Sequence, residues 1–126
     1  MASNGEFTGP ARLDRRTKRL TRRLKPGDVA IIDHRDIDRV SAEELVDSGA
    51  LVVVNCSPSQ TGRFPNPGPL LLVRGGVELV DVDGQALFDA ISEGELVSVH
   101  DSSVFRNGDC VATGRTSAVR LSSRSV

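Results

Sequence analysis

Apolar positions fall into two patterns along this chain, and together they predict an α/β fold. Short apolar runs bounded by turn residues indicate buried strands, whereas apolar residues three and four apart indicate helices. The predicted strands cover residues 28–33, 50–55, 77–80 and 95–100, followed by a hairpin within 104–113. The predicted helices cover residues 11–24, 41–48, 70–74 and 85–92. This order predicts a layered mixed sheet with a β-α-β-α-β-α core, a C-terminal β-hairpin and an N-terminal basic helix.

Turn and capping residues agree with these boundaries. Ser41 followed by Glu44 is a capping box, in which Ser41 caps the helix and Glu44 reaches back toward it. Gly49 is typical of a helix end. The dipeptide Asn107-Gly108 between two alternating runs is the strongest short signal for a hairpin. The run 51–54 is apolar without interruption, which indicates a central strand covered on both faces.

The loop from Asn55 to Pro69 is the first candidate for a binding site. It lies between a buried strand and a helix, so its N–H groups and the positive helix end would point at one spot. The candidate ligand-binding residues in this loop are Asn55, Ser57, Ser59, Thr61, Gly62, Arg63 and Asn66. Arg63 would add a bidentate cation for an anion or phosphate, and three prolines would stiffen the loop. The alternative is that these residues serve turn geometry and cap backbone groups.

Asp33, His34 and Asp81 complete the predicted ligand-binding set because they follow strands, where sheets of this class gather functional residues. His34 can act as a base near neutral pH, oriented by Asp33. The alternative, which we favour, is a turn histidine bonded to neighbouring backbone. Two Asp-x-Asp pairs, at 36–38 and 81–83, have a spacing too common to predict a metal site. We therefore assign no metal ligand and no catalytic residue.

The net charge of −1 hides a strong asymmetry along the chain. Residues 11–25 carry eight Lys or Arg and one acid, hence +7, whereas residues 26–113 carry five basic and fifteen acidic residues, hence −10. The basic segment can bind nucleic acid or anionic lipid, dock on an acidic surface within or between subunits, or remain solvated. It has no aromatic residue to stack on bases. We predict docking, a homodimer formed through this basic arm, and no nucleic acid.

Bulk composition places further bounds on the protein. A chain of 126 residues can bury a real core as one domain, and the absence of Trp and Tyr predicts that this core is aliphatic. No apolar run approaches the ~18 residues that span a bilayer, and the start of the chain has no apolar signal region, so we expect a cytoplasmic protein. Cys56 and Cys110 fit no metal motif and are expected to be reduced and unpaired.

Composition also suggests how the chain is divided. We interpret residues 1–8 as an expression scar, 9–26 as the basic helical arm and 27–114 as the α/β domain. Residues 115–126 are rich in Ser and Arg and show no periodic pattern, which predicts a disordered tail or linker.

Three strings resemble one bacterial family, over roughly residues 9–114. They are ARLDRRTKRLTRRLKPGDVAIIDH (11–34), DIDRVSAEELVDSGALVVVNCSPSQTGRFPNPGP (36–69) and GGVELVD (75–81). They resemble the N-terminal region of the cytokinetic ring protein SteA family, also described as thiamin pyrophosphokinase-like. The resemblance implies a cell-division role, a division-protein partner and localisation at the division site. It also implies a following kinase-like domain that would use ATP and Mg²⁺, so that this chain is a truncated N-terminal domain without a cofactor of its own.

A weaker similarity links the order of elements, with the strings GDV, GGV and EGELVSVH, to the swivelling β/β/α domains. That group includes domains that carry a phosphorylated histidine in the loop after the central strand. The loop at 55–69 has no histidine, so phosphotransfer by this loop is not expected.

Three functional hypotheses follow. The first is a non-catalytic interaction or regulatory domain of a SteA-like cell-division protein, with an anion-binding loop. The second is a ligand-binding accessory domain of a thiamin pyrophosphokinase-like enzyme, inactive alone because the chain has no GxxxxGK phosphate loop. The third is a swivelling domain that handles phosphoryl or acyl groups. A loop at 55–69 that is closed by its own side chains would count against this third hypothesis.

Overall fold

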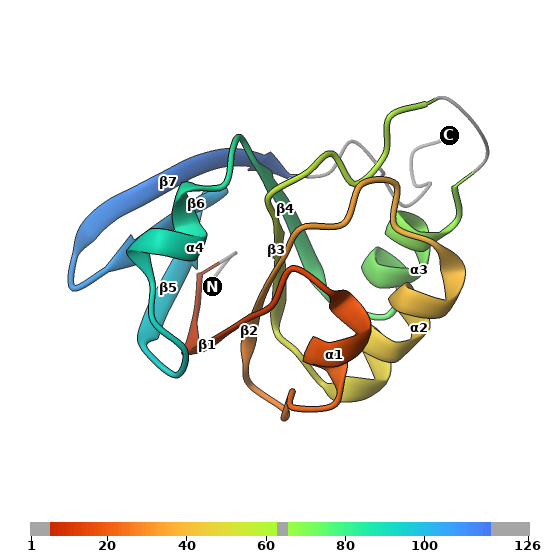
Figure 1. The fold of residues 1–126 in the computed structure, drawn as a ribbon, viewed down its shortest axis with the longest axis horizontal. Coiled ribbons are helices and arrows are strands. Elements are labelled where there is room, and N and C mark those ends of the chain that lie inside the picture. Colours follow the sequence, from red (N-terminus) through yellow and green to blue (C-terminus); the bar gives the residue numbers. More distant parts are fainter. Residues whose placement is uncertain (1–5, 63–65, 117–126) are drawn as a thin grey trace.

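A computed structural model describes residues 6–62 and 66–116, and the strands in this part of the chain form a closed barrel (Figure 1). The strands are β1 (Phe7–Leu13), β2 (Val29–Ile32), β3 (Val52–Asn55), β4 (Glu78–Val82), β5 (Leu96–His100), β6 (Ser103–Arg106) and β7 (Asp109–Thr116). The helices are α1 (Thr17–Thr21), α2 (Arg39–Ser48), α3 (Gly68–Arg74) and α4 (Ala86–Ala90). Around the barrel the strand order is β1-β2-β3-β4-β7-β6-β5.

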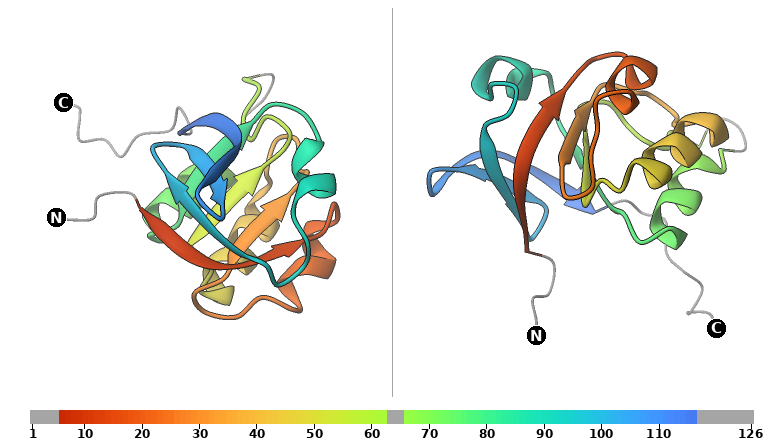
Figure 2. Two further views of the ribbon diagram at one scale, coloured as in Figure 1. Left: turned by 90° about the vertical axis from the view of Figure 1, so that its left-hand side faces the viewer. Right: turned by 90° about the horizontal axis from the view of Figure 1, so that it is seen from below.

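The barrel has a parallel half and an antiparallel half. Strands β1, β2, β3 and β4 are parallel neighbours, as expected for strands joined through helices. Strands β5, β6 and β7 are antiparallel and join the parallel half at both ends, through β1–β5 and β4–β7. Figure 2 (left) shows the strands curving around the barrel.

The predicted layered sheet is therefore wrong, and β1 is the reason. A layered sheet has two free edges, whereas β1 pairs with β2 on one side and with β5 on the other. The sequence prediction placed residues 1–8 in an expression scar and began a helix at Ala11, so it contained no strand to close the barrel. In the structure Phe7 and Thr8 pair with Val99 and Ser98 of β5.

The long N-terminal basic helix is also wrong. Residues 11–13 end β1, and only Thr17–Thr21 form the helix α1. Between them Asp14 accepts a hydrogen bond from the backbone N–H of Arg16 at 2.9 Å, which forms a local turn in place of a helix. The helical spacing of Thr17 and Leu20 is real, because both are buried against the fold, but it extends over only about one turn.

Two apolar clusters hold the fold together, one inside the barrel and one beneath the helices. Alternate residues of β2 and β3 belong to each cluster: Val29 and Ile31 face the barrel interior, whereas Ala30 and Ile32 pack toward α1, α2 and α3. The prediction of a central strand covered on both faces is confirmed for β3, whose four residues are all buried. Leu87 of α4 joins the barrel cluster.

Glycine allows the close approach of strands at one seam of the barrel. A Cβ atom built on Gly114 of β7 would lie 2.0 Å from the backbone oxygen of Asp81 on β4. No side chain fits at that distance, so the β4–β7 pairing requires glycine at this position.

Several local predictions are confirmed. The turn Asn107-Gly108 joins β6 to β7, and both residues have positive φ, 54° and 83°. Helix α2 ends at Gly49, whose φ is 80°. The capping box differs, because Asp38 is the N-cap and its carboxylate accepts from the N–H of Ser41 at 3.2 Å. Strand β7 extends to Thr116, and the rest of the predicted tail, 117–126, lies outside the described residues.

Candidate functional site

Asn55, at the carboxyl end of β3, organises the loop that the sequence predicted as a binding site. Its side chain is fully buried. The amide oxygen accepts from the backbone N–H groups of His34 (2.9 Å) and Ser57 (3.1 Å). The amide nitrogen donates to the carbonyl of His34 and to the hydroxyl of Ser59, both at 2.8 Å. All four of these hydrogen bonds are to groups of the protein itself, so the Asn55 amide joins its own loop to the segment that follows β2.

Ser59 and Asp81 form the second internal link of the loop. The buried Ser59 hydroxyl donates to Asp81 Oδ1 at 2.5 Å, and the Ser59 N–H donates to Asp81 Oδ2 at 3.1 Å. Asp81 lies on β4 directly beside Asn55 in the strand register. Asn66 adds a hydrogen bond from its Nδ2 to the carbonyl of Ser59 at 2.8 Å.

Thr61 and Asp36 form the third link, between this loop and the loop before α2. The Thr61 N–H donates to Asp36 Oδ1 at 2.8 Å, and the Thr61 hydroxyl donates to the same carboxylate at 3.0 Å. Asp36 has φ of 52°, and its own N–H donates to the carbonyl of Pro58 at 2.9 Å. A left-handed non-glycine residue is stabilised here by contacts on both its backbone and its side chain.

The remaining predicted loop residues contribute less to this internal hydrogen-bond network. The Ser57 hydroxyl donates to Asp33 in a short hydrogen bond. Gly62 is exposed with φ of 82°, and a Cβ there would meet nothing within 4 Å, so it provides only backbone freedom. Arg63, the predicted anion ligand, lies outside the described residues.

Cys56 is buried next to this network, and its environment suppresses ionisation. Burial raises the pKa of the Cys56 thiol to about 11, and the nearby carboxylate of Asp33 acts in the same direction, whereas Arg15 opposes it. A thiol with so high a pKa contains almost no thiolate at neutral pH. Cys56 is therefore a structural residue of the barrel core.

His34 is held between α1 and α2. Its Nδ1 lies 2.8 Å from the hydroxyl of the buried Thr17, and its Nε2 lies 3.2 Å from a carboxylate oxygen of Asp38. Burial raises the pKa of Asp38, but hydrogen bonds from Ser41 and the charge of His34 outweigh it and lower the pKa below its ordinary value. The ring is therefore engaged on both sides by side chains, and not by the neighbouring backbone that the sequence analysis favoured.

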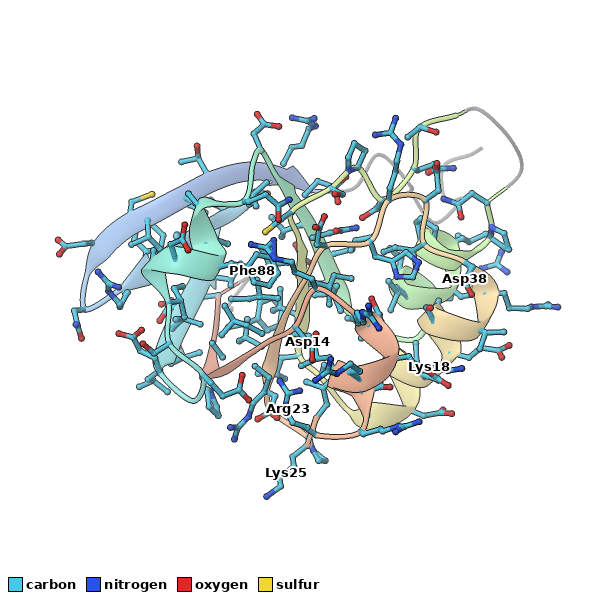
Figure 3. The ribbon with its side chains drawn as sticks, viewed as in Figure 1. Asp14, Lys18, Arg23, Lys25, Asp38 and Phe88 are labelled. Carbon is cyan, nitrogen blue, oxygen red and sulfur yellow. The ribbon has the colours of Figure 1, made fainter. Side chains whose placement is uncertain are left out.

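A cleft of about 470 Å³, the α1–α2 cleft, opens beside His34 at the carboxyl ends of β1 and β2. It is lined by Arg15, Arg16, Thr17, Lys18, Asp33, His34, Arg35, Asp38, Val40, Ser41 and Glu44. Ligands of sheets with parallel strands typically bind beyond these strand ends. Figure 3 shows Lys18 on α1 and Asp38 at the start of α2 on the same side of the molecule.

Of the predicted site residues, Asp33 and His34 line this cleft, whereas Asn55, Ser59, Thr61 and Asp81 form the internal network. The sequence analysis missed Arg15, Arg35 and Val40 as site residues. Arg15 was placed on a long helix, but it lies in the turn after β1, where its guanidinium stacks 4.3 Å from the ring centroid of Phe88. A sequence signal showing that the basic segment begins as a strand, and becomes a helix only at Thr17, would have placed Arg15 correctly.

No group of three His, Cys, Asp or Glu side chains within residues 6–62 and 66–116 is arranged to hold a metal ion. None of the helices in those ranges combines the length and the apolar character that crossing a membrane requires.

Comparisons with known proteins establish similarity of fold alone. No protein-family model matches the chain, and no curated protein matches it in sequence. A solved structure of 3-isopropylmalate dehydratase (leuD) from Methanocaldococcus jannaschii is similar, with a TM-score of 0.54 and 12% sequence identity. The similarity covers 88% of this chain and 82% of the other. At this sequence identity the similarity shows a shared fold, and no residue role is transferred from the dehydratase to this chain.

Proposed function

We propose that this chain is a non-catalytic interaction domain that forms a homodimer through its basic segment. The resemblance to the SteA family suggests that such a domain would serve the assembly or regulation of a cell-division protein at the division site. The observation that carries the proposal is the division of the basic segment into cations that are neutralised within the fold and cations that are not.

The first group fixes the basic segment to its own barrel. Arg12 pairs with the buried carboxylate of Asp28 at 3.2 Å. Arg23 pairs with Asp14 at 3.1 Å and with Glu93 at 3.3 Å, and it also donates to the carbonyl of Leu13 at 2.9 Å. Figure 3 shows Arg23 and Asp14 close together beside α1. These contacts turn the segment into a fixed part of the surface.

The second group forms what we call the basic ridge, Arg16, Lys18, Arg22 and Lys25. All four side chains are exposed, and none has an ion pair with a described residue. Lys25 extends away from the ribbon in Figure 3. A set of exposed, unpaired cations on a segment that the fold holds in place favours an acidic protein surface, because such complementarity steers association and sets orientation.

A second copy of the chain supplies such a surface. Residues 26–113 carry a net charge of −10, from five basic and fifteen acidic residues. Asp83, Asp89 and Asp109 are exposed and have no side-chain partner among the described residues. The ridge of one copy can therefore meet carboxylates of another in a two-fold arrangement, in which each copy contributes both surfaces.

Light scattering at low and high salt tests this proposal. We expect a dimer at about 20 mM salt that dissociates toward monomer at about 500 mM, where the Debye length is only a few ångströms. The double variant Arg22→Gln/Lys25→Gln should weaken the dimer about tenfold or more. Arg74→Gln/Arg115→Gln, which removes two exposed cations from other elements, is the matched control. A monomer at low salt, with a folded chain, would rule the proposal out.

The α1–α2 cleft supports a second candidate, a ligand-binding accessory domain of a thiamin pyrophosphokinase-like enzyme. The cleft is large enough for a small molecule and contains four cationic side chains. ATP and Mg²⁺ would then belong to the longer protein. Calorimetry with thiamin, with and without Mg²⁺, separates the candidates, because only the accessory-domain candidate expects heat from thiamin.

A further inference from the structure

We propose that the α1–α2 cleft is a binding site for a phosphate ester, with the phosphate on Arg16, Lys18 and Arg35 and the organic part of the ligand over Val40. The site shares Arg16 and Lys18 with the basic ridge, whereas Arg35 and Val40 lie outside the ridge. It differs from the predicted loop at 55–69. Four observations carry the inference: unpaired cations, acids that are already bonded, an exposed apolar side chain and a rigid frame.

The cations of the cleft are available to a ligand. Arg16, Lys18 and Arg35 are exposed, line the same cleft and have no hydrogen bond or ion pair from their side chains to any described residue. They come from two segments, the β1–α1 turn with the start of α1 and the loop after β2. A phosphate monoester carries between −1.5 and −2 charge at pH 7, and two guanidinium groups with one ammonium group suit it.

The carboxylates of the cleft are outnumbered by its cations, and each one has a partner within the fold. Asp33 accepts from Ser57 and lies 3.9 Å from Arg15. Asp38 caps α2 and contacts His34. Glu44 accepts from the hydroxyl of Thr21 at 3.3 Å. Hydrogen bonds from hydroxyl groups do not cancel a charge, but the cleft is lined by four Lys or Arg side chains and three carboxylates, so its formal charge is positive.

Val40 indicates that the ligand is larger than inorganic phosphate. Its side chain is 57% exposed, which makes it one of two exposed large hydrophobic residues in the described chain, and it lines the cleft. A cavity of about 470 Å³ has several times the volume of a phosphate ion and lies within the range of small-molecule sites. The apolar or ring part of a phosphate ester would cover Val40 and remove it from water.

The walls of the cleft are rigid enough to be preorganised. The backbone of His34, next to Arg35, is bonded on both sides to the buried amide of Asn55. The His34 ring is held by Thr17 and Asp38. Preorganised walls lower the entropic cost of binding. In this arrangement the loop at 55–69 supports the site from behind without touching the ligand.

Titration of the full chain, followed by amide chemical shifts, tests the site. The probes are adenosine 5′-monophosphate, glucose 6-phosphate, inorganic phosphate, adenosine and glucose. We expect at least one phosphate ester to bind with a dissociation constant tighter than about 1 mM and to shift the amides of residues 15–18 and 34–35. Inorganic phosphate should bind more weakly at the same residues, and the two compounds without phosphate should not bind there.

Variants then assign the roles. Arg35→Gln and Lys18→Gln should each weaken the phosphate ester about tenfold, whereas the control Arg74→Gln should change nothing. Val40→Ser should weaken the ester and leave inorganic phosphate unchanged. The site is refuted if neither ester shifts residues 15–18 and 34–35, or if Arg74→Gln weakens binding as much as Arg35→Gln. Because Arg35 and Val40 lie outside the basic ridge, the results for Arg35→Gln and Val40→Ser stand or fall separately from the dimer.

Discussion

Asn55 and Asp81 hold the same hydroxyl group between them, that of Ser59. The amide nitrogen of Asn55 donates to the Ser59 oxygen at 2.8 Å, and the Ser59 hydroxyl donates to Asp81 at 2.5 Å. The two residues face each other across β3 and β4, so the sheet itself sets the geometry. The polar loop after β3 is in this way fixed to the end of the barrel, and its side chains stabilise the fold.

Replacing Asn55 should be costly for stability. Asn55→Ala removes four hydrogen bonds and deprives the half-buried backbone N–H and C=O of His34 of these partners, so we expect a loss of about 2–4 kcal/mol. Urea unfolding measures it. Asn66→Ala, which removes one bond from a half-buried residue, should cost about 1 kcal/mol and serves as the comparison. Equal losses in the two variants would show that Asn55 does not organise the loop.

Gly114 should tolerate no side chain. Gly114→Ala places a Cβ about 2 Å from the backbone oxygen of Asp81, so β7 must move away from β4 and the barrel loses part of its closing seam. We expect a loss of at least about 2 kcal/mol in thermal or urea unfolding. At Gly84, where φ is 82° and the Cβ would meet nothing within 4 Å, alanine should cost only the left-handed backbone strain, about 1 kcal/mol. A smaller effect at Gly114 than at Gly84 would contradict the seam.

Cys56 should resist alkylation while Cys110 reacts. Cys56 is buried and the pKa of its thiol is raised to about 11, whereas Cys110 is exposed. In the Cys110→Ser variant, which retains only Cys56, we expect almost no iodoacetamide adduct at pH 8 in the folded state and complete modification in urea. Mass spectrometry of the intact chain measures the fraction of iodoacetamide adduct in the folded and the unfolded state. Rapid labelling of the folded variant would show that the thiol is accessible and ionised.

The same raised pKa predicts a loss of stability at high pH. Between pH 9 and 11 the folded thiol keeps its proton, whereas the unfolded thiol, with an ordinary pKa of 9.0, releases it. The contribution of Cys56 to the free energy of unfolding is therefore complete below pH 9 and falls as the pH rises toward 11. The slope approaches at most about 1.4 kcal/mol per pH unit. Cys56→Ala should show a smaller decline between pH 9 and 11 than the parent chain, and parallel curves would contradict the assignment.

Asp14 should make the fold sensitive to acid. Burial raises the pKa of Asp14, but the N–H of Arg16 and the charges of Arg23 and Arg19 outweigh this effect and lower the pKa below its ordinary 3.8. Stability from this carboxylate is therefore present above pH 3.8 and is lost as the pH falls through the lowered value. Unfolding of Asp14→Asn between pH 5 and 2 should depend less on pH than that of the parent. Asp109→Asn, at an exposed and unpaired position, should leave the profile unchanged.

The predicted site illustrates why sequence reasoning succeeded only in part. It named Ser59, Thr61 and Asp81 as polar groups that gather near one strand end, and they do gather there. It assigned them to a ligand because the pattern of a polar loop before a helix is the same whether the hydroxyls face solvent or an internal carboxylate. The partners that decide between these cases, Asp36 and Asp81, lie 25 and 22 residues away from Thr61 and Ser59 in the chain.

The sequence by itself determined the elements whose signals are local. The apolar runs of β2 and β3, the end of α2 at Gly49 and the turn at Asn107-Gly108 each depend on a few adjacent residues, and each was predicted. Only the tertiary structure decided that β1 closes a barrel, because its pairing with β5 joins residues about 90 positions apart. It also decided which cations remain unpaired, since a guanidinium group such as that of Arg23 is neutralised by Glu93 only when the fold brings the two together.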